Sequence, residues 1–169
     1  VSGVRLRLFI DRIDELEDGS RVIVDYKTGS VSATDWFGER PADLQLPLYS
    51  FACRGVPVSA VAFAQVRADG MAFTGVVSEA GVLPGLPSGS RVLKEATASW
   101  PQVLTDWEEK LQALALEFAQ GRCAIEPVDG LNTCRKKYCE LAPLCRIREP
   151  LPDSTEAIAV ASAVEWVDD

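Results

Sequence analysis

Two strand-like segments joined by a turn constrain the fold of this chain more than any other feature. Residues 4–10 alternate apolar and basic side chains before becoming fully apolar, and residues 21–26 are rich in β-branched side chains. Residues 17–20, with the sequence Glu-Asp-Gly-Ser, are typical of a turn, so the two segments predict a β-hairpin. This hairpin would place Asp11, near the end of one strand, beside Asp25, near the end of the other.

The next part of the chain predicts an α/β fold, a mixed sheet of about four or five strands flanked by helices. A helix is expected over residues 41–55, opened by a proline and closed by a glycine. Residues 58–66 and 71–77 predict two further strands, joined at a turn of the Asp-Gly type. The apolar face expected for the helix consists of Leu44, Leu48 and Phe51.

A loop and a long helix complete this reading. Residues 81–90 are rich in Pro, Gly and Ser and predict a surface loop, whereas residues 99–120 predict a helix. Trp36 and Phe37 either stack on bases or close one end of the core. The apolar stripe of the long helix consists of Val103, Leu104, Trp107, Leu111, Leu114 and Phe118.

The length of 169 residues is enough for one domain with a real core and a small appendage. We expect a core over residues 1–121, a cysteine-containing segment over 122–150 packed on it, and a loosely ordered acidic tail over 151–169. The chain begins with Val and its only methionine is Met71, so we expect it to be a piece of a longer protein.

Composition excludes several kinds of chemistry. The chain contains no His, which excludes Ser-His-Asp triads and His-ligated zinc within it. Lys and Arg number 17 against 25 Asp and Glu, and the net charge of −8 disfavours nucleic-acid binding by the whole surface. No apolar run is long enough to cross a bilayer, so no membrane partner is expected.

The predicted hairpin concentrates charged groups at one point. Asp25 and Lys27 lie two residues apart on a strand and therefore share a face, while Tyr26 points away. Two converging carboxylates repel each other unless a cation lies between them, and hard oxygen ligands select Mg²⁺ or Mn²⁺. With Asp11 and Lys27 beside it, such a cation would suit phosphodiester hydrolysis. The alternative is a solvated hairpin whose charges keep a sheet edge soluble.

Three motifs in this order resemble the RecB-like branch of the PD-(D/E)XK nucleases. They are Phe-Ile-Asp-Arg-Ile-Asp at 9–14, Val-Asp-Tyr-Lys-Thr-Gly at 24–29 and Gln-Leu-Pro-Leu-Tyr at 45–49. The resemblance covers about residues 4–148 and is closest to the C-terminal nuclease domain of AddB-type and predicted DNA-repair proteins. It implies a restriction-endonuclease-like core, here lacking the helix that opens the family's fold.

The resemblance also implies a role for each matching residue. Asp11 and Asp25 would bind the metal together with the backbone carbonyl of Tyr26, and Lys27 would be the catalytic lysine. Gln45 and Tyr49 would lie on the helix beside the site and contact DNA. Arg12 and Asp14 are more readily interpreted as a surface ion pair.

Five cysteines suggest a second metal site. An odd number, with Cys134, Cys139 and Cys145 close together, favours metal ligation over disulfides and indicates a reducing compartment, by default the cytoplasm. Related nucleases carry a similar cluster that binds [4Fe–4S] with a fourth, upstream cysteine, so the cluster would be incomplete here, and zinc is the competing metal. Cys53 and Cys123 are either substitutes for that ligand or buried thiols. Basic residues that could touch DNA phosphates flank the cluster: Arg135, Lys136 and Lys137.

These patterns leave three functional hypotheses. The first is a Mg²⁺-dependent DNA nuclease of recombination or repair, an exonuclease type working with a helicase domain or subunit. The second is a non-catalytic DNA-binding or scaffolding domain of a helicase–nuclease complex, held by an iron–sulfur or zinc site. The third is a zinc-stapled interaction module whose carboxylates are incidental.

Overall fold

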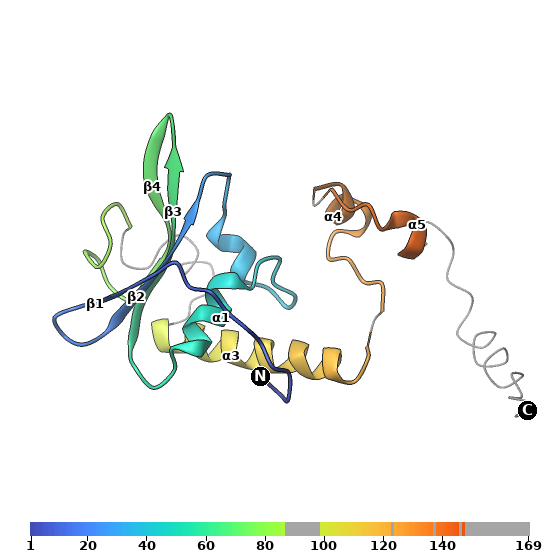
Figure 1. The fold of residues 1–169 in the computed structure, drawn as a ribbon, viewed down its shortest axis with the longest axis horizontal. Helices are drawn as coiled ribbons and strands as arrows, with labels where there is room; N and C mark the ends of the chain where they lie inside the picture. Colours follow the sequence, from blue (N-terminus) through green and yellow to red (C-terminus); the bar gives the residue numbers. More distant parts are fainter. Residues whose placement is uncertain (87–98, 123, 137, 146, 148–169) are drawn as a thin grey trace, which may run out of the picture. The chain divides into compact units, whose positions relative to one another are not determined.

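A computed structural model describes residues 1–86, 99–122, 124–136, 138–145 and 147 of the chain (Figure 1). The chain divides into two compact units, Val1–Cys123 and Ala124–Asp169. The first unit contains β1 (Arg12–Glu15), β2 (Arg21–Lys27), the 3-10 helix η1 (Ala33–Trp36), α1 (Gln45–Ala52), β3 (Val58–Arg67), β4 (Gly70–Val77) and α3 (Trp100–Ala119). The second contains α4 (Gly130–Lys136) and α5 (Ala142–Cys145). None of the helices in these described ranges is long and apolar enough to cross a membrane.

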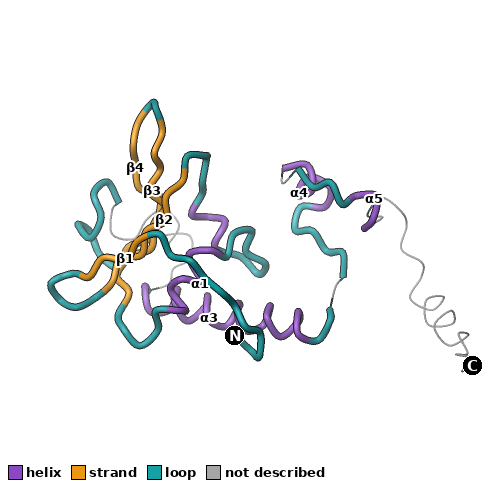
Figure 2. Tube along the Cα trace, in the orientation of Figure 1, coloured by secondary structure: helices purple, strands orange, loops and turns teal. Residues whose placement is uncertain are grey.

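The sheet has four strands in the order β1-β2-β3-β4 and confirms the predicted α/β class. β2 pairs antiparallel with β1 and parallel with β3, and β3 pairs antiparallel with β4. A parallel pair needs a crossover connection, and α1 lies in the connection between β2 and β3 (Figure 2). The predicted strands at 21–26, 58–66 and 71–77 are therefore confirmed, as is the long helix.

Side-chain alternation along the strands produces two cores, one on each face of the sheet. Ile23 of β2 and Phe63 of β3 face the helices, together with buried residues of η1, α1 and α3. Val24 and Ala62 face the opposite side, where Leu83 covers them from the loop that follows β4. Residues 81–86 confirm the predicted loop as far as it is described, and residues 87–90 lie outside the described residues.

The first predicted strand is wrong. Residues 4–10 form no strand, and β1 begins only at Arg12. Leu8 and Ile10 nevertheless pack against the core while Phe9 is 69% exposed. The alternation therefore matches burial at Leu8 and Ile10 but not at Leu6, which is 44% exposed. The segment lacks the hydrogen-bonded partner that a strand requires.

Two details of the predicted helices also need correction. α1 begins at Gln45 rather than Pro41, and its buried residues are Leu46, Pro47, Tyr49 and Ser50 instead of the predicted apolar face. In α3 the predicted stripe holds at Val103, Trp107 and Leu111, but Phe118 is 75% exposed. This helix therefore carries apolar side chains beyond the end of the core that it covers.

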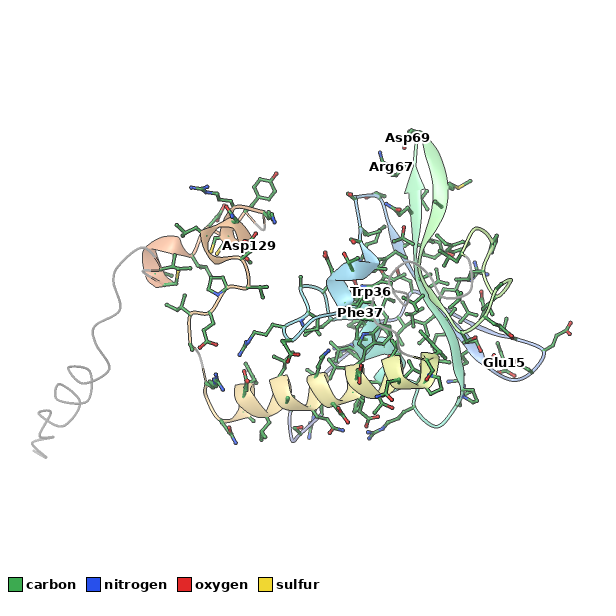
Figure 3. All side chains as sticks on the ribbon, turned by 180° about the vertical axis from the view of Figure 1, so that it is seen from behind. Glu15, Trp36, Phe37, Arg67, Asp69 and Asp129 are labelled. Atoms are coloured by element: carbon green, nitrogen blue, oxygen red, sulfur yellow. The ribbon has the colours of Figure 1, made fainter. Side chains whose placement is uncertain are left out.

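Trp36 and Phe37 belong to the core. Trp36 has no exposed surface, and its backbone carbonyl accepts a hydrogen bond from the indole N–H of Trp107 at 3.0 Å. Phe37 packs against the same cluster, 5.6 Å from the Trp107 ring between centroids (Figure 3). Of the two alternatives for this pair, the structure therefore favours closure of the core over stacking on bases.

Gly75 of β4 gives the first testable prediction. A Cβ there would lie 2.3 Å from the Val61 carbonyl oxygen and 2.7 Å from Ala62 Cα, both backbone atoms that cannot move independently of β3. We expect Gly75→Ala to lower the free energy of unfolding by about 2 kcal/mol, which corresponds to a fall in Tm of roughly 8 °C. Differential scanning calorimetry measures this fall.

The control is Gly29→Ala. A Cβ at Gly29 has no neighbour within 4 Å, and the backbone there is not in the left-handed region. We expect its Tm to stay within about 2 °C of the unmodified chain. Equal melting temperatures for the two variants would contradict the packing described for β4.

Candidate active site

The centre of the site is the end of β2, on the face of the sheet that the helices cover. Asp25 is only 2% exposed, whereas the Lys27 side chain retains 32% of its surface. Their charged groups form an ion pair, with Lys27 Nζ 2.7 Å from Asp25 Oδ2. Tyr26, between them, points away and is 47% exposed. The alternation predicted for these three residues is therefore what the structure shows.

α1 supplies the group that joins the two charges. Its first residue is Gln45, whose backbone N–H donates to Asp43 Oδ1 at 2.8 Å, a local turn just before the helix. The Gln45 side-chain amide accepts a hydrogen bond from Lys27 Nζ at 2.7 Å and donates to Asp25 Oδ1 at 2.7 Å. Only one orientation of the amide satisfies both neighbours, because the ammonium can only donate and the carboxylate can only accept.

Tyr49 extends this network one helical turn along α1. Gln45 Nε2 approaches the Tyr49 hydroxyl at 2.9 Å, and that hydroxyl donates to the backbone carbonyl of Phe9. The Phe9 carbonyl is a contact that sequence reasoning missed, since it lies 40 residues from Tyr49. The effect is to attach α1 to the segment that carries Asp11.

Asp11 lies beside Asp25 although it precedes β1. The pairing of Arg12 with Val24 sets the register of the hairpin, and Asp11 Oδ2 accepts a hydrogen bond from the Tyr26 backbone N–H at 3.0 Å. The Asp11 carboxyl group is close enough to Asp25 to raise the pKa of the Asp25 carboxyl. The structure therefore brings Asp11, Asp25, Lys27, Gln45 and Tyr49 together in one site.

Burial dominates the electrostatics of Asp25. It raises the pKa of the Asp25 carboxyl, the Lys27 ammonium 2.7 Å away lowers that pKa, and the neighbouring Asp11 carboxyl group raises it. The net direction is upward. Asp25 is therefore a carboxylate whose charge the fold does not fully compensate.

Phe63 is a second residue that sequence reasoning did not place at the site. It is the partner of Asp25 in the parallel β2–β3 pairing, and its ring lies 5.4 Å below Lys27 Nζ. The aromatic face forms an apolar floor beneath the ammonium and attracts its charge. A buried aromatic on the neighbouring strand was visible in the sequence, but the register that places it here was not.

The donor set suits a divalent cation bound by oxygen. Asp25 Oδ2 is buried and, although close to Lys27, receives no well-directed hydrogen bond from the described residues. Asp11 supplies a second carboxylate beside it, and oxygen ligands are those that Mg²⁺ prefers. The described residues contain no group of three or more His, Cys, Asp or Glu side chains that could hold a metal. Within the described part of the chain, a further ligand would therefore be a neutral oxygen such as a backbone carbonyl.

Arg12 and Asp14 form the predicted surface ion pair, with Arg12 Nη2 2.8 Å from Asp14 Oδ2. Arg12 also donates to the Tyr26 hydroxyl at 3.2 Å. Both side chains are substantially exposed. This pair lies on β1 and belongs to the surface of the sheet.

The cysteines of the second unit are not gathered in this way. Cys134 of α4 and Cys145 of α5 are half-buried and Cys139 is exposed, and no metal-binding group is found among the described residues. Neither Cys123 nor Lys137 falls within those residues. Cys53 is buried in the first core, which agrees with its interpretation as a buried thiol rather than a cluster ligand. Lys136 forms an ion pair with Asp129 at 3.1 Å. The structure gives no support to an iron–sulfur cluster.

A mixed sheet with a carboxylate–lysine pair at the end of its second strand defines a restriction-endonuclease-like nuclease core. Comparison with protein-family models matches residues 1–146 to the PD-(D/E)XK nuclease superfamily, whose members generally use Mg²⁺ or a similar divalent metal. The chain belongs to this superfamily. Searches of curated proteins and of solved structures return no match.

Proposed function

We propose that this chain is a Mg²⁺-dependent deoxyribonuclease in which Asp11 and Asp25 bind the metal. The observation that carries the proposal is the closed network of Asp25, Lys27 and Gln45, with contacts of 2.7 Å throughout. A bound divalent cation would supply Lewis-acid stabilisation of the phosphate and a more acidic water. The backbone carbonyl of Tyr26 is the third ligand that we propose.

The protein side chains have separate tasks in this mechanism. Lys27 is held by Asp25 and Gln45 but remains one-third exposed, so its ammonium is oriented and can still approach a phosphate oxygen. A fixed cation at that place stabilises negative charge that develops as the phosphodiester is attacked. Gln45 orients both charged groups, and Tyr49 positions the Asp11 segment through the Phe9 carbonyl.

The finer parts of the proposal rest on motif order and cysteine spacing. A RecB-like or AddB-type nuclease of recombination or repair, working in the cytoplasm with a helicase domain or subunit, is consistent with the three ordered motifs. Only the sequence supports two further features. One is an iron–sulfur or zinc site formed by Cys134, Cys139 and Cys145, and the other is a set of DNA contacts from Arg135, Lys136 and Lys137.

The direct test is incubation of the chain with labelled linear duplex and single-stranded DNA in Mg²⁺ or Mn²⁺. We expect cleavage, and we expect Lys27→Ala to reduce its rate by at least about 100-fold, because the substitution removes an oriented charge at the scissile phosphate. Gel electrophoresis of the products gives the rates.

Lys110→Ala is the matched control, since it removes a lysine from α3 rather than from the site. Its cleavage rate should equal that of the unmodified chain. Equal cleavage by Lys27→Ala would contradict the assigned role of this residue. DNA binding without cleavage would favour the scaffolding alternative. The observation that supports this alternative is that the described residues of the site include only two carboxylates.

A further inference from the structure

The segment that leads to Asp11 has a surface that the site does not use. Residues 1–10 contain two arginines and no acidic residue, in a chain of net charge −8. Arg5 and Arg7 are both exposed, and neither forms an ion pair with any residue that the structure describes. On an acidic protein, the segment therefore presents positive charge that no described acidic residue pairs with.

An exposed aromatic ring lies in the same segment. Phe9 is 69% exposed, and the Arg7 guanidinium lies over its ring at 4.9 Å from the centroid. Leu8 and Ile10 pack into the core, so Arg7, Phe9 and Asp11 alternate with them and face outward. Since a residue advances the chain by at most about 3.5 Å, the Phe9 backbone is within about 7 Å of Asp11.

The segment is held in place at two points. The Phe9 carbonyl accepts the hydrogen bond of Tyr49, and Ser2 Oγ donates to the Gln112 carbonyl of α3 at 3.0 Å. The dark blue trace in Figure 1 starts beside α3 and passes α1 on its way to β1. Attachment of this kind fixes an exposed ring before a ligand arrives, which lowers the entropy lost on binding.

We propose that Arg5, Arg7 and Phe9 form a binding track for a single strand of DNA that leads its phosphates to Asp11; this inference rests on the proposed nuclease function. Unpaired bases stack on aromatic side chains, and arginines neutralise the phosphates between them. A paired duplex offers its phosphates but keeps its bases stacked inside, so Phe9 contributes to single-strand binding selectively.

A second arginine–aromatic stack in the same unit provides the matched control. Arg54 lies over the Phe51 ring at 4.5 Å, but Arg54 Nη1 is also 3.6 Å from Glu108, so its charge is partly compensated. Phe51 is on α1 but takes no part in the network of Gln45 and Tyr49. Replacing Phe51 thus removes a comparable ring without touching the track.

The test measures binding of fluorescein-labelled oligo(dT) and of a labelled duplex by fluorescence anisotropy, in EDTA to prevent cleavage. We expect Phe9→Ala to raise the Kd for oligo(dT) about tenfold and the Kd for duplex less than about twofold. Phe9→Tyr should restore oligo(dT) binding to within about twofold, because it keeps the ring. Arg7→Ala should lower the slope of log K against log salt by about 0.7.

Either of two results overturns the track: equal weakening of oligo(dT) and duplex by Phe9→Ala, or a loss in Phe51→Ala as large as in Phe9→Ala. Absence of oligo(dT) binding by the unmodified chain overturns it as well. The nuclease proposal is judged separately by cleavage in Mg²⁺. If oligo(dT) binding depends on Phe9 but no cleavage occurs, the track is supported and the nuclease proposal is rejected. If cleavage occurs but Phe9→Ala binds oligo(dT) as tightly as the unmodified chain, the nuclease proposal is supported and the track is rejected.

Discussion

Asp25→Asn is expected to abolish cleavage while leaving the chain folded. The substitution removes the buried charge that we propose binds the metal, and metal stabilisation of a transition state is worth several kcal/mol, so we expect a loss of at least about 1,000-fold. Asparagine has nearly the same shape, and its oxygen can still accept the hydrogen bond of Gln45 Nε2. Cleavage rates and Tm, measured on the same preparation, separate the two effects.

The pH dependence of stability gives a second readout for the same variant. The pKa of Asp25 is raised by burial, so the folded chain holds this proton more tightly than the unfolded chain does. The stability that comes from the protonated carboxyl is complete below the unfolded pKa and is lost as pH rises through the folded pKa. Asp25→Asn has no such loss, so its Tm relative to the unmodified chain should rise between pH 4 and neutrality.

Asp14→Asn is the control for this experiment. Asp14 is a neighbouring acid on β1, but it is exposed and pairs with Arg12 rather than with the site. Surface ion pairs of this kind contribute about 0–1 kcal/mol, so neither cleavage nor Tm should change appreciably. A relative Tm of Asp25→Asn that falls with rising pH would show that the ionised Asp25 stabilises the fold.

The sequence predicted the parts of this structure that depend on local pattern. Alternation along residues 21–27 is enough to place Asp25 and Lys27 on one face, because side chains in any strand alternate. The spacing of Gln45 and Tyr49 likewise places them one turn apart on a helix. These regularities need no knowledge of distant contacts, and they account for most of the candidate site.

What the sequence could not predict depends on partners far away in the chain. Residues 4–10 have a strand pattern, but no neighbouring strand pairs with them, and a pattern of burial cannot reveal that. α1 is apolar on most of its surface, so its sequence does not determine which face is buried. Tyr49 is oriented by the carbonyl of Phe9, and Lys27 lies over Phe63; both contacts follow from register and packing rather than from local spacing.

Trp107→Ala is expected to have the largest effect on stability. The Trp107 side chain is 2% exposed and makes edge-to-face contacts with Trp36 and Trp100, each at 6.1 Å between ring centroids. Its removal leaves a cavity and an unpaired Trp36 carbonyl, and we expect a loss of about 3–5 kcal/mol in the free energy of unfolding. Domains of this size are stabilised by about 5–15 kcal/mol in total. Urea denaturation followed by tryptophan fluorescence measures the loss.

Two further variants test whether the loss of stability comes from the buried ring of Trp107. Phe118→Ala, on the same helix but 75% exposed, should change stability by less than about 0.5 kcal/mol. Trp107→Phe keeps an aromatic ring and loses the hydrogen bond to Trp36, so about 1 kcal/mol should be lost.

The link to function runs through a chain of aromatic contacts. Trp36 packs against Phe63 at 5.2 Å, and Phe63 is the floor beneath Lys27. Removing the Trp107 side chain therefore removes support from the Phe63 ring beneath the Lys27 ammonium. We expect the cleavage rate of Trp107→Ala to be lower than that of the unmodified chain even at temperatures below the midpoint of unfolding. A variant that keeps full activity until it unfolds would show instead that Asp25 and Gln45 alone are sufficient to hold Lys27.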